Sequence, residues 1–264
     1  MNEILKLESI SLIFGGIHAV EDVSFSLETG SLTGLIGPNG AGKTSVFNVL
    51  TGMYVPTSGR VVFDGQSLGK SAPHQLVERG IARTFQNIRL FGYLSILQNI
   101  LVALNPQMHY SKTEGMFRLP RYWREERAMR DRAMELLALF GLDSVAGQEA
   151  ASLPYGDQRK LEIARALATH PKLLLLDEPA AGMNPTETEE LMRTIALIRE
   201  QFAITVLLIE HDMKLVLGIC ERLIVMDHGR VIAQGDPQEV VRRKEVVTAY
   251  LGEEGGEDGL VGSA

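Results

Sequence analysis

A glycine-rich segment near the start of the chain has the residue types and spacing that bind phosphate groups. It matches the pattern G-x-x-x-x-G-K-[ST], with an apolar run at 32–36 before it and a stretch that favours a helix at 45–50 after it. A strand that turns directly into a helix aims several backbone N–H groups and the positive end of the helix dipole at one point. We therefore expect the β- and γ-phosphates of a nucleotide to be bound by Gly37, Asn39, Gly40, Ala41, Gly42, Lys43, Thr44 and Ser45.

Four side chains, two in this segment and two later in the chain, are expected to do chemistry on those phosphates. Lys43 would reach the phosphate oxygens, and the Thr44 hydroxyl would complete part of a Mg²⁺ shell. Asp177 and Glu178 directly follow an apolar run at 173–176, which is typical of a central strand in a parallel sheet, and ligand sites lie at the carboxyl edge of such sheets. We expect Asp177 to hold Mg²⁺ through water and Glu178 to act as the general base on the attacking water. The alternative is an acidic turn after a core strand.

A histidine follows a second apolar run and is expected at the same edge of the sheet. His211 comes after residues 204–210, of which all but Thr205 and Glu210 are apolar. At that edge its side chain would donate to the γ-phosphate or hold the attacking water. The alternative is a structural or helix-capping histidine.

Composition restricts the classes of partner and compartment. The formal charge of −7 and a pI of about 5.5 leave no global positive field for nucleic acid, so no nucleic-acid partner is expected. A single cysteine, Cys220, cannot form an internal disulfide, which suits a reducing compartment. No run of apolar residues is long enough to span a membrane, and the first residues lack the layout of a secretory signal. If the protein works at a membrane, other chains must supply the spanning segments.

The hydrophobic periodicity predicts an α/β fold with a helical insertion. Period-two alternation predicts strands in the first third at 10–14, 20–27, 32–36 and 60–63. Spacings of three and four predict helices at 96–104, 123–140 and 157–168, so residues 85–165 are expected to form the insertion. The last third predicts an alternation typical of a parallel sheet, with strands at 172–176, 204–209 and 223–225 and helices at 186–201 and 214–220. The acidic, glycine-rich tail at 252–264 is expected to be disordered.

These motifs, in this order, resemble the nucleotide-binding subunit of ATP-binding cassette (ABC) transporters. Residues 153–160, about twenty positions before Asp177, are part of the resemblance. Segments 83–91, 153–158 and 177–185 are similar to the LivG-type ATPases of branched-chain amino-acid importers. The resemblance covers residues 4–251 as a single domain. It implies a P-loop NTPase (RecA-like) core, an N-terminal antiparallel β subdomain, an inserted α-helical subdomain, and hydrolysis of ATP with Mg²⁺. It also implies a peripheral position on the cytoplasmic face of the inner (plasma) membrane, two transmembrane permease subunits, and a second ATPase subunit that is identical or paralogous.

The resemblance also implies roles for individual residues. Phe14 matches the aromatic residue that stacks on adenine, although a core aromatic at a strand edge is the alternative. Gln86 matches the catalytic-site glutamine that touches Mg²⁺ and hinges the helical insertion. His211 matches the switch histidine. Residues 180–184 match the loop where two ATPase subunits meet. Tyr155, Gly156 and Asp157 match the signature segment, which crosses the dimer interface to cap the γ-phosphate on the opposite subunit.

The chain departs from the family pattern at several positions. The signature Leu-Ser-Gly-Gly-Gln has Pro154 for serine, Tyr155 for the first glycine and Asp157 for glutamine, and Asn184 stands where aspartate is usual. Loss of the serine hydroxyl removes one hydrogen bond to a charged group, worth about 1.5 to 3 kcal/mol. Because Gly156 and the following backbone N–H groups remain, we expect a weakened but working cap. The alternative outcome is an inactive site. Whether Asn184 still couples the two ATPase subunits is a question that the sequence leaves open.

Other functions are also compatible with this sequence. A soluble ABC machine would carry the same motifs, a phosphotransferase kinase would share only the phosphate loop, and an importer of urea or another solute would look alike. The apolar residues at 85–94 would either receive a short permease helix or pack the insertion. The arginine-rich run at 118–132 is interrupted by acidic residues, which favours a solvated helix over a nucleic-acid or lipid site.

Overall fold

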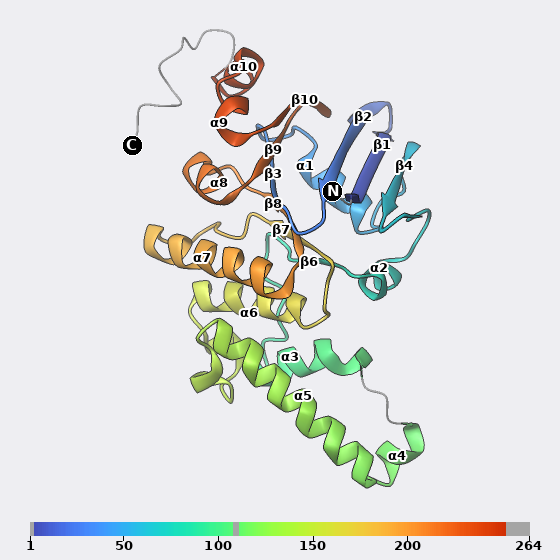
Figure 1. Cartoon of the computed structure of the whole chain (residues 1–264), viewed down its shortest axis with the longest axis vertical. Coiled ribbons are helices and arrows are strands. Elements are labelled where there is room, and N and C mark those ends of the chain that lie inside the picture. Colours follow the sequence, from blue (N-terminus) through green and yellow to red (C-terminus); the bar gives the residue numbers. More distant parts are fainter. Residues whose placement is uncertain (1–2, 108–110, 252–264) are drawn as a thin grey trace. The chain divides into compact units, whose positions relative to one another are not determined.

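The protein, studied as a computed structural model, is described at residues 3–107 and 111–251 and forms two compact units (Figure 1). Of the described residues, the first unit contains 3–83, 172–179 and 195–251, and the second contains 84–107, 111–171 and 180–194. The second unit thus covers the expected insertion and adds the start of a later helix. The tail at 252–264, expected to be disordered, lies outside the described residues.

A six-stranded sheet forms the centre of the first unit, in the order β10-β9-β3-β8-β7-β6. Five of its strands are parallel, and β10 pairs with β9 in the antiparallel sense. All residues of β3, β7 and β8 are buried, because helices cover both faces of such a sheet. The strands are β3 (Leu32–Ile36), β6 (Ile81–Arg83), β7 (Leu173–Asp177), β8 (Thr205–Ile209), β9 (Arg222–Asp227) and β10 (Arg230–Gly235).

A second, antiparallel sheet in the same unit has the order β2-β1-β4-β5. Helix α1 (Lys43–Leu50) lies between the two sheets, and one apolar core joins its buried face to side chains from both (Figure 1). This helix follows β3 after six residues, so the core that holds α1 also holds the turn before it. The strands are β1 (Glu3–Phe14), β2 (Ile17–Glu28), β4 (Ser58–Phe63) and β5 (Gln66–Ser67).

The remaining helices of the first unit are short, and the C-terminal part of α7 also belongs to this unit. Among the described residues they are α2 (Pro73–Arg79), α8 (Met213–Ile219), α9 (Pro237–Val240) and α10 (Lys244–Leu251). Asp212 begins α8 by accepting hydrogen bonds from the N–H groups of Lys214 and Leu215. Helix α7 (Pro185–Phe202) starts in the second unit, and its residues from Ile195 onward belong to the first.

The second unit is helical. Its helices are α3 (Ile96–Leu104), α4 (Lys112–Met116), α5 (Pro120–Leu139) and α6 (Tyr155–Leu167), with short 3-10 turns at 105–107, 143–145 and 150–152. Ser95 and Gln98 form a reciprocal capping box that begins α3. Helices α3, α5 and α6 pack against one another, while the N-terminal part of α5 and α4 extend beyond them (Figure 1).

The predicted strands and helices are present, with shifted ends that have local causes. Strand β1 begins at Glu3 rather than Ile10, because bulges near Ser9, which has a φ of 48°, break the alternation that the sequence analysis required. Helix α6 begins at Tyr155 rather than Asp157, since Pro154 takes the N-cap position. Three strands, β5, β6 and β10, and four helices, α2, α4, α9 and α10, were not predicted from the sequence.

Within 3–107 and 111–251, no helix combines the length and the apolar character that crossing a bilayer requires.

The buried centre of β7 should dominate the stability of the first unit. Leu175 is 0% exposed and lies in the shared core, so Leu175→Ala should lower the free energy of unfolding by about 2 to 5 kcal/mol. Leu197→Ala on α7 is the matched control, because that side chain is 51% exposed and its loss should cost less than about 1 kcal/mol. Urea denaturation of both variants measures the difference. Equal losses would contradict the assigned core.

Candidate active site

The turn between β3 and α1 is built so closely that two of its positions admit only glycine. A Cβ at Gly37, whose φ is 147°, would lie 2.0 Å from the Met226 carbonyl oxygen, and one at Gly42, whose φ is 97°, would lie 2.5 Å from the Ala19 carbonyl oxygen. Gly42 caps α1 without a side-chain hydrogen bond, and no acidic residue occupies the first turn. The N–H groups at this helix start are therefore left for an external anion.

Lys43 folds back over this turn. Its Nζ donates hydrogen bonds to the carbonyl oxygens of Gly37 at 2.6 Å and Pro38 at 3.0 Å, and the residue is only 8% exposed. Burial lowers the pKa of the Lys43 ammonium, while the negative charges of Glu178 and then Asp177 act in the opposite direction. A partly desolvated cation inside a ring of backbone groups is suited to bind phosphate oxygens.

The register of the parallel sheet brings the phosphate turn and the carboxylates to one edge. Ile209 of β8 pairs with Leu35 on one side and with Asp177 on the other. Those two residues are therefore level with each other and two strands apart, roughly 10 Å. Gly37 follows Leu35 by two positions, so the turn begins two residues beyond the level of Asp177, on the side to which Glu178 follows. The structure thus places both motifs at the carboxyl edge, as the sequence analysis expected.

Asp177 is buried and paired with a cation that the sequence analysis did not identify. Its Oδ2 accepts a hydrogen bond from Arg83 at 2.7 Å, and each side chain is 6% exposed. Arg83 comes from the end of β6, the neighbouring strand, and also donates to Asn48 Oδ1 of α1 at 2.7 Å. The arginine links α1 to the end of β7, and so it orients the carboxylate relative to the phosphate turn.

Glu178 and His211 meet at the same edge. His211 Nδ1 lies 3.8 Å from Glu178 Oε1, with the imidazole 61% exposed and the carboxylate 21% exposed. The Glu178 backbone has a φ of 46°, in the left-handed region that glutamate rarely occupies, and its N–H donates to the Ile209 carbonyl at 3.0 Å. Residues held in such conformations cluster at functional sites, because the surrounding structure must impose them.

The oxygen donors of this unit fit a Mg²⁺ ion. Mg²⁺ typically takes one or two carboxylates, a hydroxyl and phosphate oxygens, rather than a cluster of protein ligands. Thr44 is exposed in the first turn of α1, and Asp177 is a buried carboxylate at the same sheet edge. No group of three His, Cys, Asp or Glu side chains suited to a metal occurs in the described parts of the chain.

Phe14 ends β1 and presents a partly open ring. It is 44% exposed and makes an edge contact with Tyr54, with ring centroids 5.0 Å apart and planes at 70°. Tyr54, which the sequence analysis did not consider, follows α1 and is 40% exposed. An edge contact holds the Phe14 ring while leaving part of its surface free, as stacking on a flat base requires.

In the second unit, the backbone around Gln86 is held by a buried arginine. Arg159 of α6 donates to the Phe85 carbonyl at 2.6 Å and to the Gln86 carbonyl at 2.7 Å, and it pairs with Glu162 at 2.9 Å. Arg159 is 0% and Glu162 2% exposed. Burial raises the pKa of Glu162, while the N–H of Arg89 and the charge of Arg159 lower it. The Gln86 side chain itself is exposed.

The signature segment forms the first turn of α6. Tyr155 takes a hydrogen bond from Arg159 at 3.3 Å, and its ring is next to Gly182, where a Cβ would lie 3.3 Å from Tyr155 Cε1. Asp157 lies 3.5 Å from Lys160 Nζ. Because Pro154 provides no side-chain cap, the first N–H groups of α6, including that of Gly156, have no side-chain acceptor from the N-cap.

Asn184 keeps a structural role where the family usually has aspartate. Its Oδ1 accepts the Glu187 N–H at 3.0 Å, and the Glu187 carboxylate accepts the Asn184 N–H at 3.0 Å. This reciprocal pair begins α7 and needs only one side-chain acceptor at position 184, which an amide supplies as well as a carboxylate.

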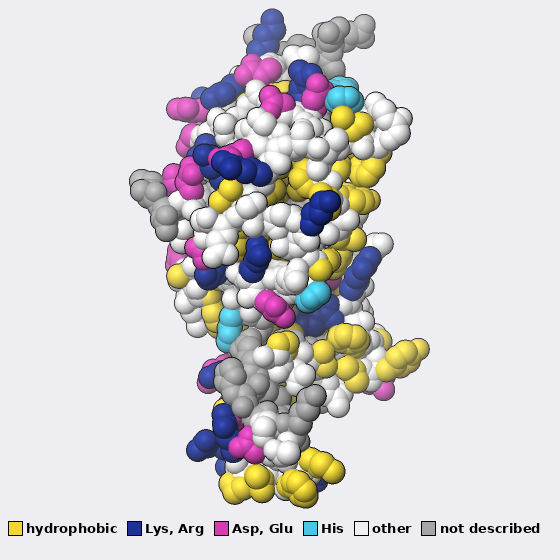
Figure 2. Space-filling model, turned by 90° about the vertical axis from the view of Figure 1, so that its right-hand side faces the viewer, with side chains coloured by type: hydrophobic (Ala, Val, Ile, Leu, Met, Phe, Trp, Pro, Cys, Tyr) yellow, Lys and Arg dark blue, Asp and Glu magenta, His cyan; other side chains and the backbone are white. Residues whose placement is uncertain are grey.

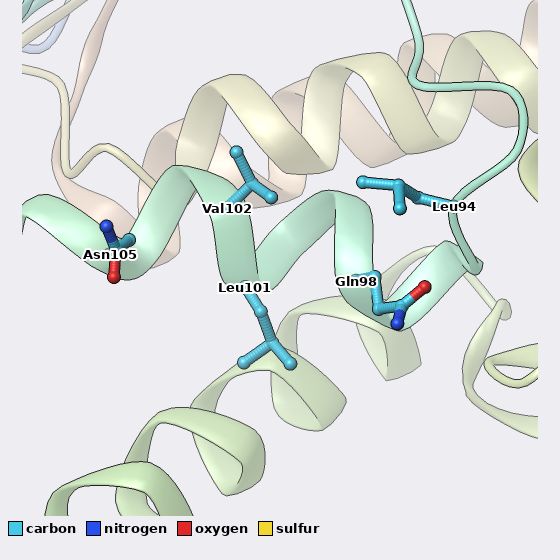
Figure 3. Close-up of a pocket in the computed structure, with 5 residues that line it drawn as sticks. All are labelled: Leu94, Gln98, Leu101, Val102 and Asn105. Carbon is cyan, nitrogen blue, oxygen red and sulfur yellow. The ribbon is translucent and has the colours of Figure 1, made fainter. Parts of the chain in front are cut away.

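A shallow hollow of about 330 Å³ lies beside α3 in the second unit (Figure 3). Of the apolar residues expected to crowd segment 85–94, only Leu94 lines it, together with α3 side chains and Asn105. Figure 3 shows Leu94 and Val102 on one side of the helix axis, and Leu101 and Gln98 on the other. Tyr93 instead projects outward and is 95% exposed.

Two buried cations, Arg83 and Arg159, were missed because the sequence gives no direct signal for them. Arg83 occupies a strand of three residues, which is too short for a periodicity, and Arg159 looks like an ordinary charged residue on an amphipathic helix. A partial signal for Arg159 was available, since Glu162 follows it by three positions and pairs at that spacing are neighbours on a helix.

Comparison with known proteins defines the family. The family model for ABC transporters matches residues 20–181, and a model for the branched-chain amino acid ATP-binding cassette transporter matches residues 230–256. The chain is 43% identical to the high-affinity branched-chain amino acid transport ATP-binding protein BraF of Pseudomonas aeruginosa and 44% identical to LivG of Escherichia coli K12. Each alignment covers 95% of this chain and 98% of the relative.

Solved structures confirm the expected fold. A nucleotide-free ATP-binding cassette from an ABC transporter matches with a TM-score of 0.82 and 33% identity, over 96% of this chain and 100% of the other. The ADP conformation of an ABC transporter cassette matches with a TM-score of 0.83, the same identity and the same coverage. The α/β core with a phosphate loop is therefore that of an ABC ATPase. On the motifs, the fold and these relatives together, the chain belongs to the ABC transporter family as an ATP-binding, ATP-hydrolysing subunit.

Proposed function

We propose that this chain powers the uptake of branched-chain amino acids by hydrolysing Mg-ATP on the cytoplasmic side of a membrane. The observation that carries the solute class is the match of residues 230–256 to the branched-chain amino acid model, because general ABC features do not include this segment. Identities of 43–44% over 95% of the chain to relatives named for that transport support it. The lipopolysaccharide export protein LptB of Escherichia coli is 33% identical, so the family alone does not select the solute.

The phosphates of ATP are proposed to bind in the turn between β3 and α1. Backbone N–H groups from Gly37 to Gly42 and the start of α1 would surround the β- and γ-phosphates. Lys43 would transfer hydrogen bonds from the Gly37 and Pro38 carbonyl oxygens to phosphate oxygens. Phe14 would stack on the adenine ring. When bound, Mg²⁺ would neutralise phosphate charge, with Thr44, Asp177 and Gln86 as the proposed ligands, directly or through water.

Hydrolysis is proposed to begin at Glu178. Its carboxylate would accept a proton from a water that attacks the γ-phosphorus in line with the leaving ADP. His211, 3.8 Å from this carboxylate, would hold the water or donate to the γ-phosphate oxygen. Arg83 would keep the Asp177 carboxylate in one orientation while Glu178 accepts the proton.

We further propose that the working unit contains two ATPase subunits and two transmembrane permease subunits. The Tyr155–Gly156–Asp157 segment would cap the γ-phosphate bound on the other ATPase subunit, through the N–H groups at the start of α6. An ABC cassette solved as a dimer with ADP and phosphate supports this arrangement, with 25% identity and a TM-score of 0.73. The exposed Tyr93 and the hollow beside α3 are the proposed contact with the permease.

The general base is tested by removing its charge. Glu178→Gln keeps the shape of the side chain but cannot accept the proton, so ATP turnover should fall at least about a hundredfold while nucleotide affinity is unchanged. Lys43→Ala should abolish nucleotide binding itself, because it removes the cation inside the turn. Phosphate release and fluorescent-nucleotide titration separate the two effects. Near-normal turnover of Glu178→Gln would remove Glu178 as the base.

The unusual signature segment is tested by restoring the serine. The natural chain should hydrolyse ATP, and Pro154→Ser should raise turnover by at most about one to two decades, because it adds one hydrogen bond to a charged group. Pro154→Ala removes the proline ring without adding a hydroxyl and so serves as the control. The expectation of a working cap fails if the natural chain shows no turnover and Pro154→Ser shows a normal rate.

The solute is tested in proteoliposomes that contain the partner permease subunits and a solute-binding protein. Labelled leucine should enter in an ATP-dependent manner, and labelled urea should not. Uptake of urea alone would overturn the proposed solute while leaving the ATPase assignment intact.

A further inference from the structure

The end of the helical unit carries exposed apolar and cationic side chains that the ATPase site does not use. We call residues 111–128, which comprise α4 and the first turns of α5, the α4–α5 tip. None of the tip side chains that the structure describes is buried, and the first buried side chain of α5 is Met129. The first nine residues of α5 therefore project by about 13 Å from the packed part of that helix.

The apolar side chains of the tip are unusually exposed for their types. Met116 is 80%, Phe117 70%, Trp123 55% and Leu119 44% exposed. Figure 2 shows apolar side chains gathered at its lower end, with Lys and Arg side chains beside them, where Figure 1 places α4 and the start of α5. Exposed apolar groups in such a cluster mark an interaction surface, whereas single ones are ordinary.

The charge around these side chains is opposite to that of the whole protein. Residues 111–130 contain six basic and three acidic residues, a formal charge of +3 in a chain whose total is −7. Arg118 lies over the Trp123 ring, with its Cζ 5.9 Å from the centroid, while Arg121 is engaged by Glu125 at 2.9 Å. Arg124, Arg127 and Arg130 follow at spacings of three and are exposed, so they share one face of α5.

We propose that the α4–α5 tip binds the surface of an anionic lipid bilayer, and the exposed apolar side chains beside the arginines are what replaces the solvated helix expected from the charge pattern alone. Phe117 and Trp123 would enter the interfacial layer, where aromatic side chains are favoured, and Arg118, Arg124 and Arg127 would meet headgroup phosphates. Charge complementarity favours lipid as the occupant, because residues 111–130 carry a formal charge of +3 next to exposed apolar side chains, which is the combination that binds an anionic headgroup layer.

The tip contains the only tryptophan of the chain, so its fluorescence reports the contact directly. Vesicles made of equal parts phosphatidylcholine and phosphatidylglycerol should shift Trp123 emission to shorter wavelength and protect it from iodide. Vesicles of phosphatidylcholine alone should not, and high salt should reverse the shift. No shift with anionic vesicles, or an equal shift with both kinds, would overturn the proposal. So would a shift that appears only with detergent-solubilised permease, since the partner would then be a protein.

Charge reversal separates the tip from the total charge of the protein. Arg124→Glu combined with Arg127→Glu should lower vesicle affinity at least about tenfold in flotation assays, because each basic residue near an anionic surface contributes several-fold. Arg60→Glu combined with Arg193→Glu makes the same change in charge at exposed sites elsewhere and should leave affinity within about twofold. An equal loss in both double variants would overturn the proposal. Both should keep their thermal unfolding midpoints, and the assay needs no nucleotide, so its result is independent of the ATPase mechanism.

Discussion

Backbone packs so tightly around the turn between β3 and α1 that the shape of this turn follows from the packing of both sheets. At Gly37 and Gly42, carbonyl oxygens from β9 and β2 occupy the space that a side chain would fill. These contacts come from both sheets, so the turn keeps its shape only while α1 stays packed between them. A cradle of N–H groups is therefore a consequence of how the two sheets enclose one helix.

Buried cations give each unit a second constraint. Arg83 links Asp177 to α1, and Arg159 links the carbonyls of Phe85 and Gln86 to α6. Each arginine pairs with a buried carboxylate and also donates to a second element, which satisfies most of a planar group with five donors. Buried ion pairs contribute little net stability, but the loss of either partner is costly because a buried charge then lacks compensation. Their value here is that they hold the end of β7 and the backbone of residues 85–86 in one arrangement.

The contacts of Tyr155 and Asn184 account for two departures from the family pattern. Tyr155, which stands where glycine is usual, packs next to Gly182 and accepts a hydrogen bond from Arg159. Asn184 supplies the single acceptor that the start of α7 needs. Substitution at both places therefore retains the local structure. Helix α5 is packed only in part. Its side chains are buried from Met129 onward and none is buried before it, so the first half of α5 is available to another surface.

The family, the phosphate-binding motif and most of the fold were predictable from the sequence. The glycine spacing at 37–42, the acidic pair after four leucines and the period of the apolar residues are local patterns, and each reflects a requirement that one segment must meet alone. The folded structure adds the alignment of Leu35 with Asp177 through Ile209, the pairing of Arg83 with that carboxylate, and the hydrogen bond from Arg159 to the Gln86 carbonyl. These depend on sheet register and on contacts between residues more than seventy positions apart, for which a single sequence has no periodic signal. The short elements β6 and α2 were not predicted for the same reason, because packing rather than propensity stabilises them.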